Sequence, residues 1–206
     1  MYLKIKRIGD ILLSFFSLIL LSPFFIAIII AIKIDSKGPI LFKQKRIGKN
    51  KKEFYILKFR TMKIETPKDT PTHLLQNPDQ YITKVGKFLR KTSLDELPQV
   101  WNIFTGQMSI IGPRPALWNQ YDLIEERDNY GANDILPGLT GWAQVNGRDE
   151  LPIKLKAELD GEYRENISLK LDAKCFYRTI ISVSKGEGVV EGEVKNKEKS
   201  RETGVK

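Results

Sequence analysis

The feature that most constrains this chain is an apolar segment close to its beginning. Residues 11–32 form a run of 22 positions without a charged side chain. As a straight helix this run would be about 33 Å long, enough to cross a hydrocarbon core of about 30 Å. The simplest interpretation is a single-pass membrane anchor. Length alone therefore predicts a membrane segment, but it does not decide whether the segment crosses the bilayer.

Two features predict a helix that enters the membrane and returns. Pro23 lies at the middle of the segment, where it removes a backbone hydrogen bond and kinks the helix, and the Ser22 hydroxyl is a candidate donor to the carbonyl that is freed. Basic residues flank the segment on both sides, and the positive-inside rule places both ends on the cytoplasmic face. These flanking residues are Lys4, Lys6 and Arg7 before the segment, and Lys33 and Lys37 after it. We therefore expect a re-entrant helix broken at Ser22 and Pro23.

The positive charge is concentrated directly after the apolar segment. Residues 33–63 contain eleven Lys or Arg and two acidic residues. The net charge of this stretch is therefore +9, the same as that of the whole chain. Such a stretch attracts anionic lipid at about 1 kcal/mol per residue, and it could also meet nucleotide phosphates. One cysteine and one histidine exclude an internal disulfide and a Ser-His or Cys-His hydrolase. Any catalysis must therefore use carboxylates, lysines, arginines or backbone groups.

The rest of the chain predicts an α+β fold. Alternation and turn residues predict two strands, at 39–44 and 54–61, that form a short hairpin. Helical spacing predicts helices at 83–91, 97–104, 153–163 and 171–183, the last of them amphipathic and suited to the membrane interface. We expect a re-entrant membrane helix over residues 1–36, a mainly helical cytoplasmic domain over 37–190, and a flexible charged tail over 191–206.

The first candidate for chemistry is the adjacent carboxylate pair Asp95 and Glu96. One interpretation is structural, because Ser93 and Glu96 fit a capping box at a helix start. That interpretation places Pro98 inside the helix, where its ring costs a hydrogen bond. A helix that begins nearer Pro98 leaves both carboxylates just before it. An ionised Asp can then attack phosphorus, and Mg²⁺ suits paired carboxylates together with a diphosphate.

Two further motifs contain candidate binding residues. Prolines on both sides of Arg114 stiffen the backbone and fix where its guanidinium points, which suits bidentate phosphate binding, although a rigid surface loop has the same pattern. The stretch 137–148 has three glycines, and its Gln144, Asn146 and Arg148 could bind a sugar, uracil or phosphate. Neither motif identifies a reaction by itself.

Together these motifs resemble a known family. The sequences Lys-Phe-Arg-Thr-Met at 58–62, Ser-Leu-Asp-Glu-Leu-Pro-Gln at 93–99, Gly-Pro-Arg-Pro at 112–115 and the stretch 137–148 follow the order found in bacterial sugar transferases. These are the monotopic phosphoglycosyl transferases, and the resemblance covers roughly residues 3–185. The short chain resembles their minimal catalytic form.

The resemblance implies a fold, a reaction and a set of residues. The N-terminal helix is re-entrant and broken at Ser-Pro, so that the protein sits in one leaflet of the cell membrane on its cytoplasmic side. Asp95 attacks the β-phosphate of a UDP-sugar, UMP leaves, and undecaprenyl phosphate then accepts the phosphosugar. Mg²⁺ acts at Asp95 and Glu96. Arg114 resembles a phosphate-binding residue, and further anion contacts are expected from Lys58, Arg90 and Arg148.

The partners expected from this resemblance are a UDP-sugar, undecaprenyl phosphate and anionic lipid. The sequence also allows a homodimer, and we expect no nucleic acid partner. The rival hypothesis is a membrane-tethered basic binding or scaffold protein without catalysis, because aromatic and basic residues interleave between Phe42 and Arg60. That hypothesis leaves Asp95 and Arg114 without a role.

Overall fold

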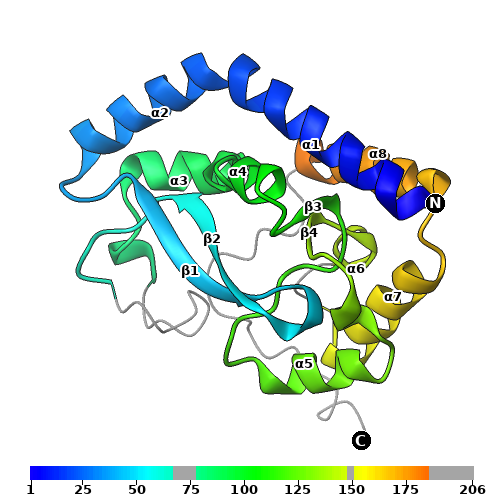
Figure 1. Cartoon of the computed structure of the whole chain (residues 1–206). Coiled ribbons are helices and arrows are strands. Elements are labelled where there is room, and N and C mark those ends of the chain that lie inside the picture. Colours follow the sequence, from blue (N-terminus) through cyan, green and yellow to red (C-terminus); the bar gives the residue numbers. More distant parts are fainter. Residues whose placement is uncertain (67–77, 148–150, 186–206) are drawn as a thin grey trace, which may run out of the picture.

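The computed structural model describes residues 1–66, 78–147 and 151–185. His73, Arg148 and the tail expected at 191–206 therefore lie outside the described residues. Within them the chain has mixed helix and small-sheet content, which confirms the α+β class. Figure 1 shows the first two helices running along one side of the molecule, above a hairpin and a set of shorter helices.

The apolar segment forms two helices with a sharp bend between them. Helix α1 (Tyr2–Leu20) and helix α2 (Ser22–Asp35) meet at Leu21 and are bent by 60°. Pro23 lies in the first turn of α2, and the Ser22 hydroxyl donates a hydrogen bond of 2.7 Å to the carbonyl of Ile19. This carbonyl is four residues before Pro23 and would otherwise lose its donor. The predicted break and the predicted Ser22 contact are both confirmed.

None of the helices in the described parts of the chain is long and apolar enough to cross a membrane by itself. The bent pair α1 and α2 passes that test only when the two are taken together. Many large apolar side chains of the pair are exposed, among them Phe16, Leu20 and Phe24 at 61%, 77% and 65%. The pair therefore presents an apolar outer surface on one side of the molecule.

Helix α1 is held to the rest of the chain by its polar face. Arg7 donates hydrogen bonds to the carbonyls of Ile103 (2.7 Å) and Phe104 (3.0 Å), which are left over at the end of a later helix. Asp10, only 4% exposed, accepts hydrogen bonds from the Ser109 hydroxyl and the backbone N–H of Ile110. The N-terminal half of α1 is therefore docked on the domain.

The predicted hairpin is confirmed, with slightly different ends. Strand β1 (Leu41–Ile47) pairs antiparallel with β2 (Glu53–Phe59) across a tight turn at residues 48–52. Phe54 and Ile56 pack on one side against Ile103 and Met108. Phe59, on the other face of the strand, packs against Phe25 of α2 and Leu89. The hairpin thus joins the bent helix pair to the interior of the domain.

Short helices and a second, very small sheet complete the fold. Helix α3 (Lys84–Lys91), α4 (Gln99–Phe104), α7 (Ile153–Glu165) and α8 (Leu169–Lys185) correspond to the four predicted helices. Helix α5 (Tyr121–Asp128), the short α6 (Trp142–Val145) and the parallel pair of β3 (Ser109–Ile111) with β4 (Gly138–Thr140) were not predicted. Figure 1 places α5 on the side of the molecule away from α1 and α2.

Helix α8 has a distinctly two-sided surface. Leu169, Phe176, Tyr177 and Ile180 are between 54% and 72% exposed, whereas Cys175 is fully buried. Its N-terminal end is tied to α1, because Asp172 accepts hydrogen bonds of 2.7 Å from Tyr2 and Lys6. An amphipathic helix with an exposed aromatic face is confirmed at this position, as the sequence predicts.

Candidate active site

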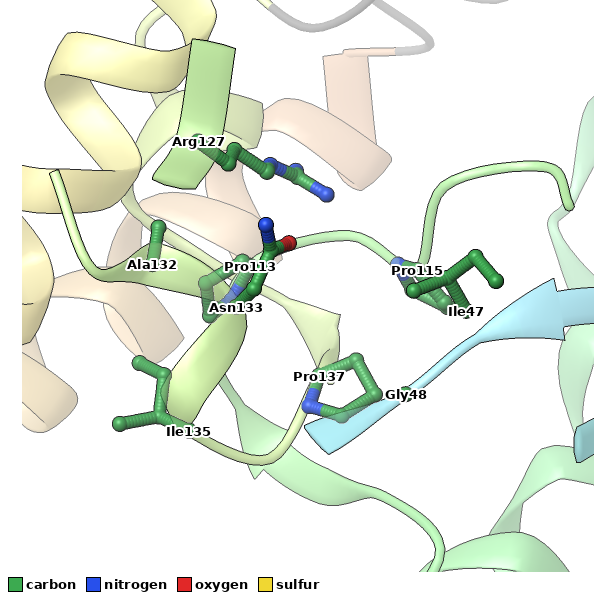
Figure 2. Close-up of a pocket in the computed structure, with 9 residues that line it drawn as sticks. All are labelled: Ile47, Gly48, Pro113, Pro115, Arg127, Ala132, Asn133, Ile135 and Pro137. Carbon is green, nitrogen blue, oxygen red and sulfur yellow. The ribbon is translucent and has the colours of Figure 1, made fainter. Parts of the chain in front are cut away.

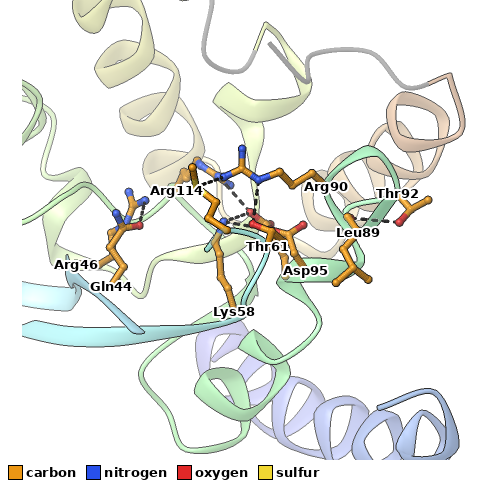
Figure 3. A network of polar contacts seen from close by, with 11 residues as sticks. Gln44, Arg46, Lys58, Thr61, Leu89, Arg90, Thr92, Asp95 and Arg114 are labelled. Carbon is orange, nitrogen blue, oxygen red and sulfur yellow. Dashed lines mark hydrogen bonds and ion pairs between the residues drawn. The ribbon is translucent and has the colours of Figure 1, made fainter. Parts of the chain in front are cut away.

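The structure brings together four of the residues that the sequence singled out. Lys58 Nζ donates a hydrogen bond of 2.7 Å to Glu96 Oε1, and Arg114 contacts the same oxygen at 3.2 Å. Asp95 Oδ2 lies 3.9 Å from Lys58 Nζ. The side chains of Lys58, Asp95 and Glu96 are only 13–19% exposed, and Arg114 is 39% exposed. Figure 3 shows Lys58, Asp95 and Arg114 converging from β2, a turn and a loop.

A strained turn presents the two carboxylates. Residues Leu94–Glu96 form a single 3-10 turn, and helix α4 starts after Pro98. Ser93 adopts a left-handed conformation, with φ of 56°, and its side chain makes no capping hydrogen bond. The capping-box interpretation is therefore wrong, and the alternative helix start near Pro98 is confirmed. A left-handed non-glycine residue costs free energy, and such strain is concentrated at functional sites.

The two carboxyl groups have opposite environments. Burial raises the pKa of Asp95, with the charge of Lys58 opposing this effect and the charge of Glu96 adding to it. Glu96 is also desolvated, but the charges and hydrogen bonds of Lys58 and Arg114 outweigh burial and hold its pKa well below the usual range. Two neighbouring carboxyl groups with pKa values pushed apart are typical of sites in which one group reacts and the other orients. Here Asp95 is the more basic of the two.

Arg90 approaches Asp95 from a different direction. Its Nε donates to the Thr61 hydroxyl at 3.0 Å, and its guanidinium lies 3.3 Å from the sulfur of Met62. Its positive charge lowers the pKa of Asp95. The Lys-Phe-Arg-Thr-Met motif at 58–62 therefore contributes Lys58 directly and holds Arg90 through Thr61. Figure 3 shows Arg90 extending from α3 toward this cluster.

Arg46, which the sequence analysis did not single out, supports the loop that carries Arg114. Its NH1 donates a hydrogen bond of 2.9 Å to the carbonyl of Pro115, and its NH2 donates to Gln44 at 2.7 Å. The concentration of basic residues after the apolar segment was a signal that could have indicated Arg46. That signal applies equally to all eleven Lys and Arg residues of 33–63, so it does not select Arg46. Only the pairing of β1 with the segment after Pro115, through Leu117, distinguishes Arg46 from the others.

A cavity opens beside the cluster, on the side of Arg46. It is small and partly open to solvent. Its lining consists of Arg46, Ile56, Lys58, Gln99, Arg114 and Pro115. Among the described side chains that line it, Arg46, Lys58 and Arg114 are cationic.

The fourth motif is placed behind the site rather than in it. Gln144 is 9% exposed, and its amide donates to the carbonyl of Leu139 at 3.3 Å. A Cβ added to Gly141 would meet the carbonyl of Gly112 at 2.0 Å, so that the glycine permits this close approach of two backbones. The motif thus packs beneath the Arg114 loop. Substrate binding by Gln144 stays a prediction, and so does that by Arg148, which lies outside the described residues.

The carboxylates meet the chemical requirements of Mg²⁺ in part. Within the described residues there is no group of three or more acidic, His or Cys side chains that could hold a metal ion. Mg²⁺, however, is commonly held by one or two carboxylates together with substrate phosphates. Asp95 suits that arrangement, since the cation that it pairs with among the described residues, Lys58, is 3.9 Å away, whereas Glu96 is engaged by Lys58 and Arg114. The residues fit a magnesium ion shared between Asp95 and a bound diphosphate.

Comparison with known proteins defines the class. The family model for bacterial sugar transferases matches residues 1–186. The chain is also 38% identical over 186 residues to a sugar transferase of Bacillus subtilis, EpsL, which is named as uncharacterized, and the match covers 90% of each chain. The chain therefore belongs to the bacterial sugar transferase family.

Several relatives are named for a specific reaction. The UDP-glucose:undecaprenyl-phosphate glucose-1-phosphate transferase of Escherichia coli is 41% identical over 183 residues, which are 85% of this chain and 39% of the relative. A UDP-N-acetylgalactosamine-undecaprenyl-phosphate N-acetylgalactosaminephosphotransferase of Aeromonas hydrophila is 38% identical over 195 residues, which are 91% of this chain and 45% of the relative. The chain thus spans less than half the length of these two relatives.

Proposed function

We propose that this protein transfers a phosphosugar from a UDP-sugar to undecaprenyl phosphate and releases UMP. The observation that carries the proposal is the placement of Asp95, a largely buried carboxylate of raised pKa, beside Lys58 and a Glu96 fixed by two cations. This arrangement suits a nucleophile next to a site for phosphate. The names of the relatives from E. coli and A. hydrophila support the choice of donor and acceptor.

The reaction that we propose has two steps. In the first, a carboxylate oxygen of Asp95 attacks the β-phosphorus of the donor, the bond from phosphorus to the bridging oxygen breaks, and UMP leaves with the electron pair. In the second, an oxygen of the acceptor phosphate attacks the same phosphorus and Asp95 is released as a carboxylate. Splitting the transfer in this way is the usual advantage of covalent catalysis.

The neighbouring side chains have supporting tasks in this proposal. Lys58 and Arg114 offset negative charge on the phosphoryl group as it is transferred, and Arg90 adds a third positive charge on the other side of Asp95. Glu96 fixes both Lys58 and Arg114 in position. Mg²⁺, when bound by Asp95 and the diphosphate, would neutralise charge on the leaving group.

We further propose that α1 and α2 form a re-entrant element in the cytoplasmic leaflet of the cell membrane. Their exposed apolar side chains and the bend at Ser22 and Pro23 support this placement. The docked face of α1 supports it too, because Arg7 and Asp10 are bound within the domain and so tie the first end of the pair to the cytoplasmic side. The basic residues after α2 would then meet anionic lipid.

Substitution of Pro23 tests this topology. We expect Pro23→Ala to favour a straighter and longer helix, because alanine restores the backbone donor and removes the clash of the ring. A fraction of the molecules should then place the N-terminus outside the cell. The measurement is labelling of an N-terminal cysteine tag by a membrane-impermeant maleimide in intact cells, with Ser17→Ala in the same helix pair as the matched control. Continued protection of the tag in Pro23→Ala would contradict the prediction.

Release of UMP tests the reaction itself. Detergent-solubilised protein is mixed with undecaprenyl phosphate, Mg²⁺ and a panel of UDP-sugars, and UMP is measured. We expect continued UMP release with at least one UDP-sugar. When undecaprenyl phosphate is omitted, UMP release should stop after a single turnover. If no UDP-sugar of the panel gives UMP while the protein still binds lipid vesicles, a binding or scaffold role without catalysis becomes the better hypothesis.

A further inference from the structure

Asp35 is an acidic residue at a position where a helix disfavours one. It is the last residue of α2, and a carboxylate is destabilising at the C-terminal end of a helix, where the helix dipole is negative. Its side chain accepts a hydrogen bond of 3.0 Å from the backbone N–H of Val85, which lies 50 residues later in the chain. The place of Asp35 in α2 therefore does not explain this aspartate, whereas its contact with α3 does.

Helix α3 receives part of its N-terminal cap from Asp35. Its first turn has the sequence Lys-Val-Gly-Lys, with two basic residues and no acidic one. Thr83 accepts a hydrogen bond of 2.9 Å from the N–H of Gly86, and Asp35 accepts from the N–H one residue earlier. The helix start thus gains a second bonded N–H and a negative charge at the positive end of its dipole. Because a helix of eight residues is marginal by itself, such contacts matter for its order.

The other end of α3 carries Arg90. Its Nε donates a hydrogen bond of 3.0 Å to the Thr61 hydroxyl, and its positive charge acts on Asp95. A Cβ added to Gly86 would lie 2.0 Å from the carbonyl oxygen of Thr61, so that the glycine allows the first turn of α3 to lie directly on this residue. Helix α3 is therefore a short bridge with Asp35 at its start and Arg90 at its end.

Apolar packing joins α2 to the same bridge. Ile32, one turn before Asp35, is 2% exposed and belongs to one buried cluster with Leu89 of α3. Val85 packs against this cluster as well. Figure 1 shows α3 beneath α2. A displacement of the end of α2 would therefore be transmitted to Leu89, the residue directly before Arg90.

We propose that Asp35 is a positioning residue of the active site, which caps α3 from the end of the bent helix pair and so holds Arg90 in place beside Asp95. The inference rests on the proposed function, in which Arg90 offsets charge on the transferred phosphoryl group. It adds to the site a residue that lies outside the four motifs. It also connects the proposed membrane element to the reacting carboxylate through a single helix.

Asp35 has a second effect, which the experiment must separate from capping. Arg60 is 6% exposed, and burial lowers its pKa while the charge of Asp35 opposes this effect. Any variant without the negative charge should therefore be less stable, whether or not α3 keeps its cap. Asparagine keeps an oxygen that can accept from the N–H of Val85, and it caps helices about as well as aspartate. Asp35→Asn thus removes the charge alone, and Asp35→Ala removes both.

Kinetics of the two variants test the proposal. Both should have a lower melting temperature, but only Asp35→Ala should lose catalysis, with kcat for UMP release about 5- to 30-fold lower, up to the effect of a strong helix cap. The KM for the UDP-sugar should change little, because the interaction that is weakened acts mainly in the transition state. Asp134→Ala, at an exposed aspartate, is the matched control. Equal losses of kcat in Asp35→Ala and Asp35→Asn, or an unchanged kcat in Asp35→Ala, would overturn the proposal.

A double-mutant cycle shows whether Asp35 acts through Arg90. In an Arg90→Lys background, Asp35→Ala should lower kcat by less than about twofold, because the guanidinium that it positions is already absent. If the losses caused by the two substitutions instead multiply, Asp35 acts independently of Arg90 and the proposal is wrong.

The position of Arg90 can also be measured without turnover. In detergent-solubilised protein with nitrogen-labelled arginine, the Nε–H resonance of Arg90, identified by its loss in Arg90→Lys, reports the hydrogen bond to Thr61. We expect this resonance to shift or broaden in Asp35→Ala and to stay unchanged in Asp35→Asn. An unchanged resonance in both variants would contradict positioning by Asp35. If no UDP-sugar gives UMP, the proposed reaction fails, and this resonance by itself decides whether Asp35 positions Arg90.

Discussion

Asp95→Asn is expected to abolish sustained UMP release, with a loss of at least about 1,000-fold, while the protein stays folded and bound to membranes. Asparagine has nearly the same shape but no anionic oxygen, so that the covalent step has no nucleophile. The measurement is UMP release with the donor that the unsubstituted protein uses. Asp134→Asn, at an exposed aspartate far along the chain from the site, is the control and should retain full activity.

Stability provides a second measurement on the same variant. Burial raises the pKa of Asp95 in the folded chain, so folding is most favoured when this group is protonated, and the benefit is lost as the pH rises through the raised pKa. At neutral pH the ionised carboxylate therefore disfavours the fold. Asp95→Asn removes that charge, and we expect an equal or higher melting temperature. A variant that is inactive because it unfolds would give the opposite result, as would substantial residual turnover of a stable variant.

The pH dependence of the unsubstituted protein follows from the same group. Attack requires the ionised form of Asp95, and its raised pKa means that protonation begins at a higher pH than for an ordinary aspartate. We expect kcat/KM to fall on acidification before Glu96 is affected, since the pKa of Glu96 is held well below its usual range. A single acidic limb at a higher pH than an ordinary aspartate would give agrees with this assignment, whereas a kcat/KM that stays constant through that range contradicts it.

Features that depend on local chemistry could be predicted from the sequence. The bend follows from Pro23, and the hydrogen bond to the carbonyl that Pro23 frees follows from the adjacent Ser22. The start of α4 follows from Pro98. The hairpin follows from alternation around a polar turn. These features are determined within a few residues, so no knowledge of distant neighbours was needed.

Features decided by distant neighbours could not be predicted. The sequence analysis used Lys6 and Arg7 only as positive charges that flank the apolar segment, whereas in the structure Lys6 contacts Asp172 at 2.7 Å and Arg7 binds the end of α4. In β2, alternation alone does not decide which face is buried. The structure exposes Tyr55 at 55% and buries Ile56 at 2%, because α4 covers the face that carries Ile56. The same pattern of residues fits either face until the packing partners are known.

The residues of the candidate site also differ in whether local sequence or distant packing identifies them. Asp95, Glu96, Lys58 and Arg114 belong to compact motifs, and the structure brings them into contact. Arg46 enters through the pairing of β1 with a later loop, which no local pattern indicates. The strands β3 and β4 have three residues each, too few for alternation to be recognised.

The ion pair beneath the Arg114 loop has a structural role of its own. Arg127 of α5 donates from Nε to Asp160 Oδ2 of α7 at 2.9 Å, and the two side chains are only 4% and 1% exposed. Ala116, just after the loop, packs against Leu123 and Ile124 of α5. Figure 2 shows Arg127 pointing toward the cavity that Pro113 and Pro115 line. The pair thus fixes α5, and α5 supports the loop that presents Arg114.

Asp160→Ala is expected to lower the free energy of unfolding by about 3–5 kcal/mol, because it leaves the guanidinium of Arg127 buried without its anion. Chemical denaturation in detergent measures this loss. Glu53→Ala removes a partner of Lys45 in an exposed pair and should cost at most about 1 kcal/mol. The double variant Arg127→Met with Asp160→Leu should recover much of the loss, since no buried charge is left. If the single and double variants are equally unstable, packing at these positions and not the unpaired charge is the cause. Should the double variant be stable yet have a raised KM for the donor, the ion pair would be needed to hold the Arg114 loop in its binding position.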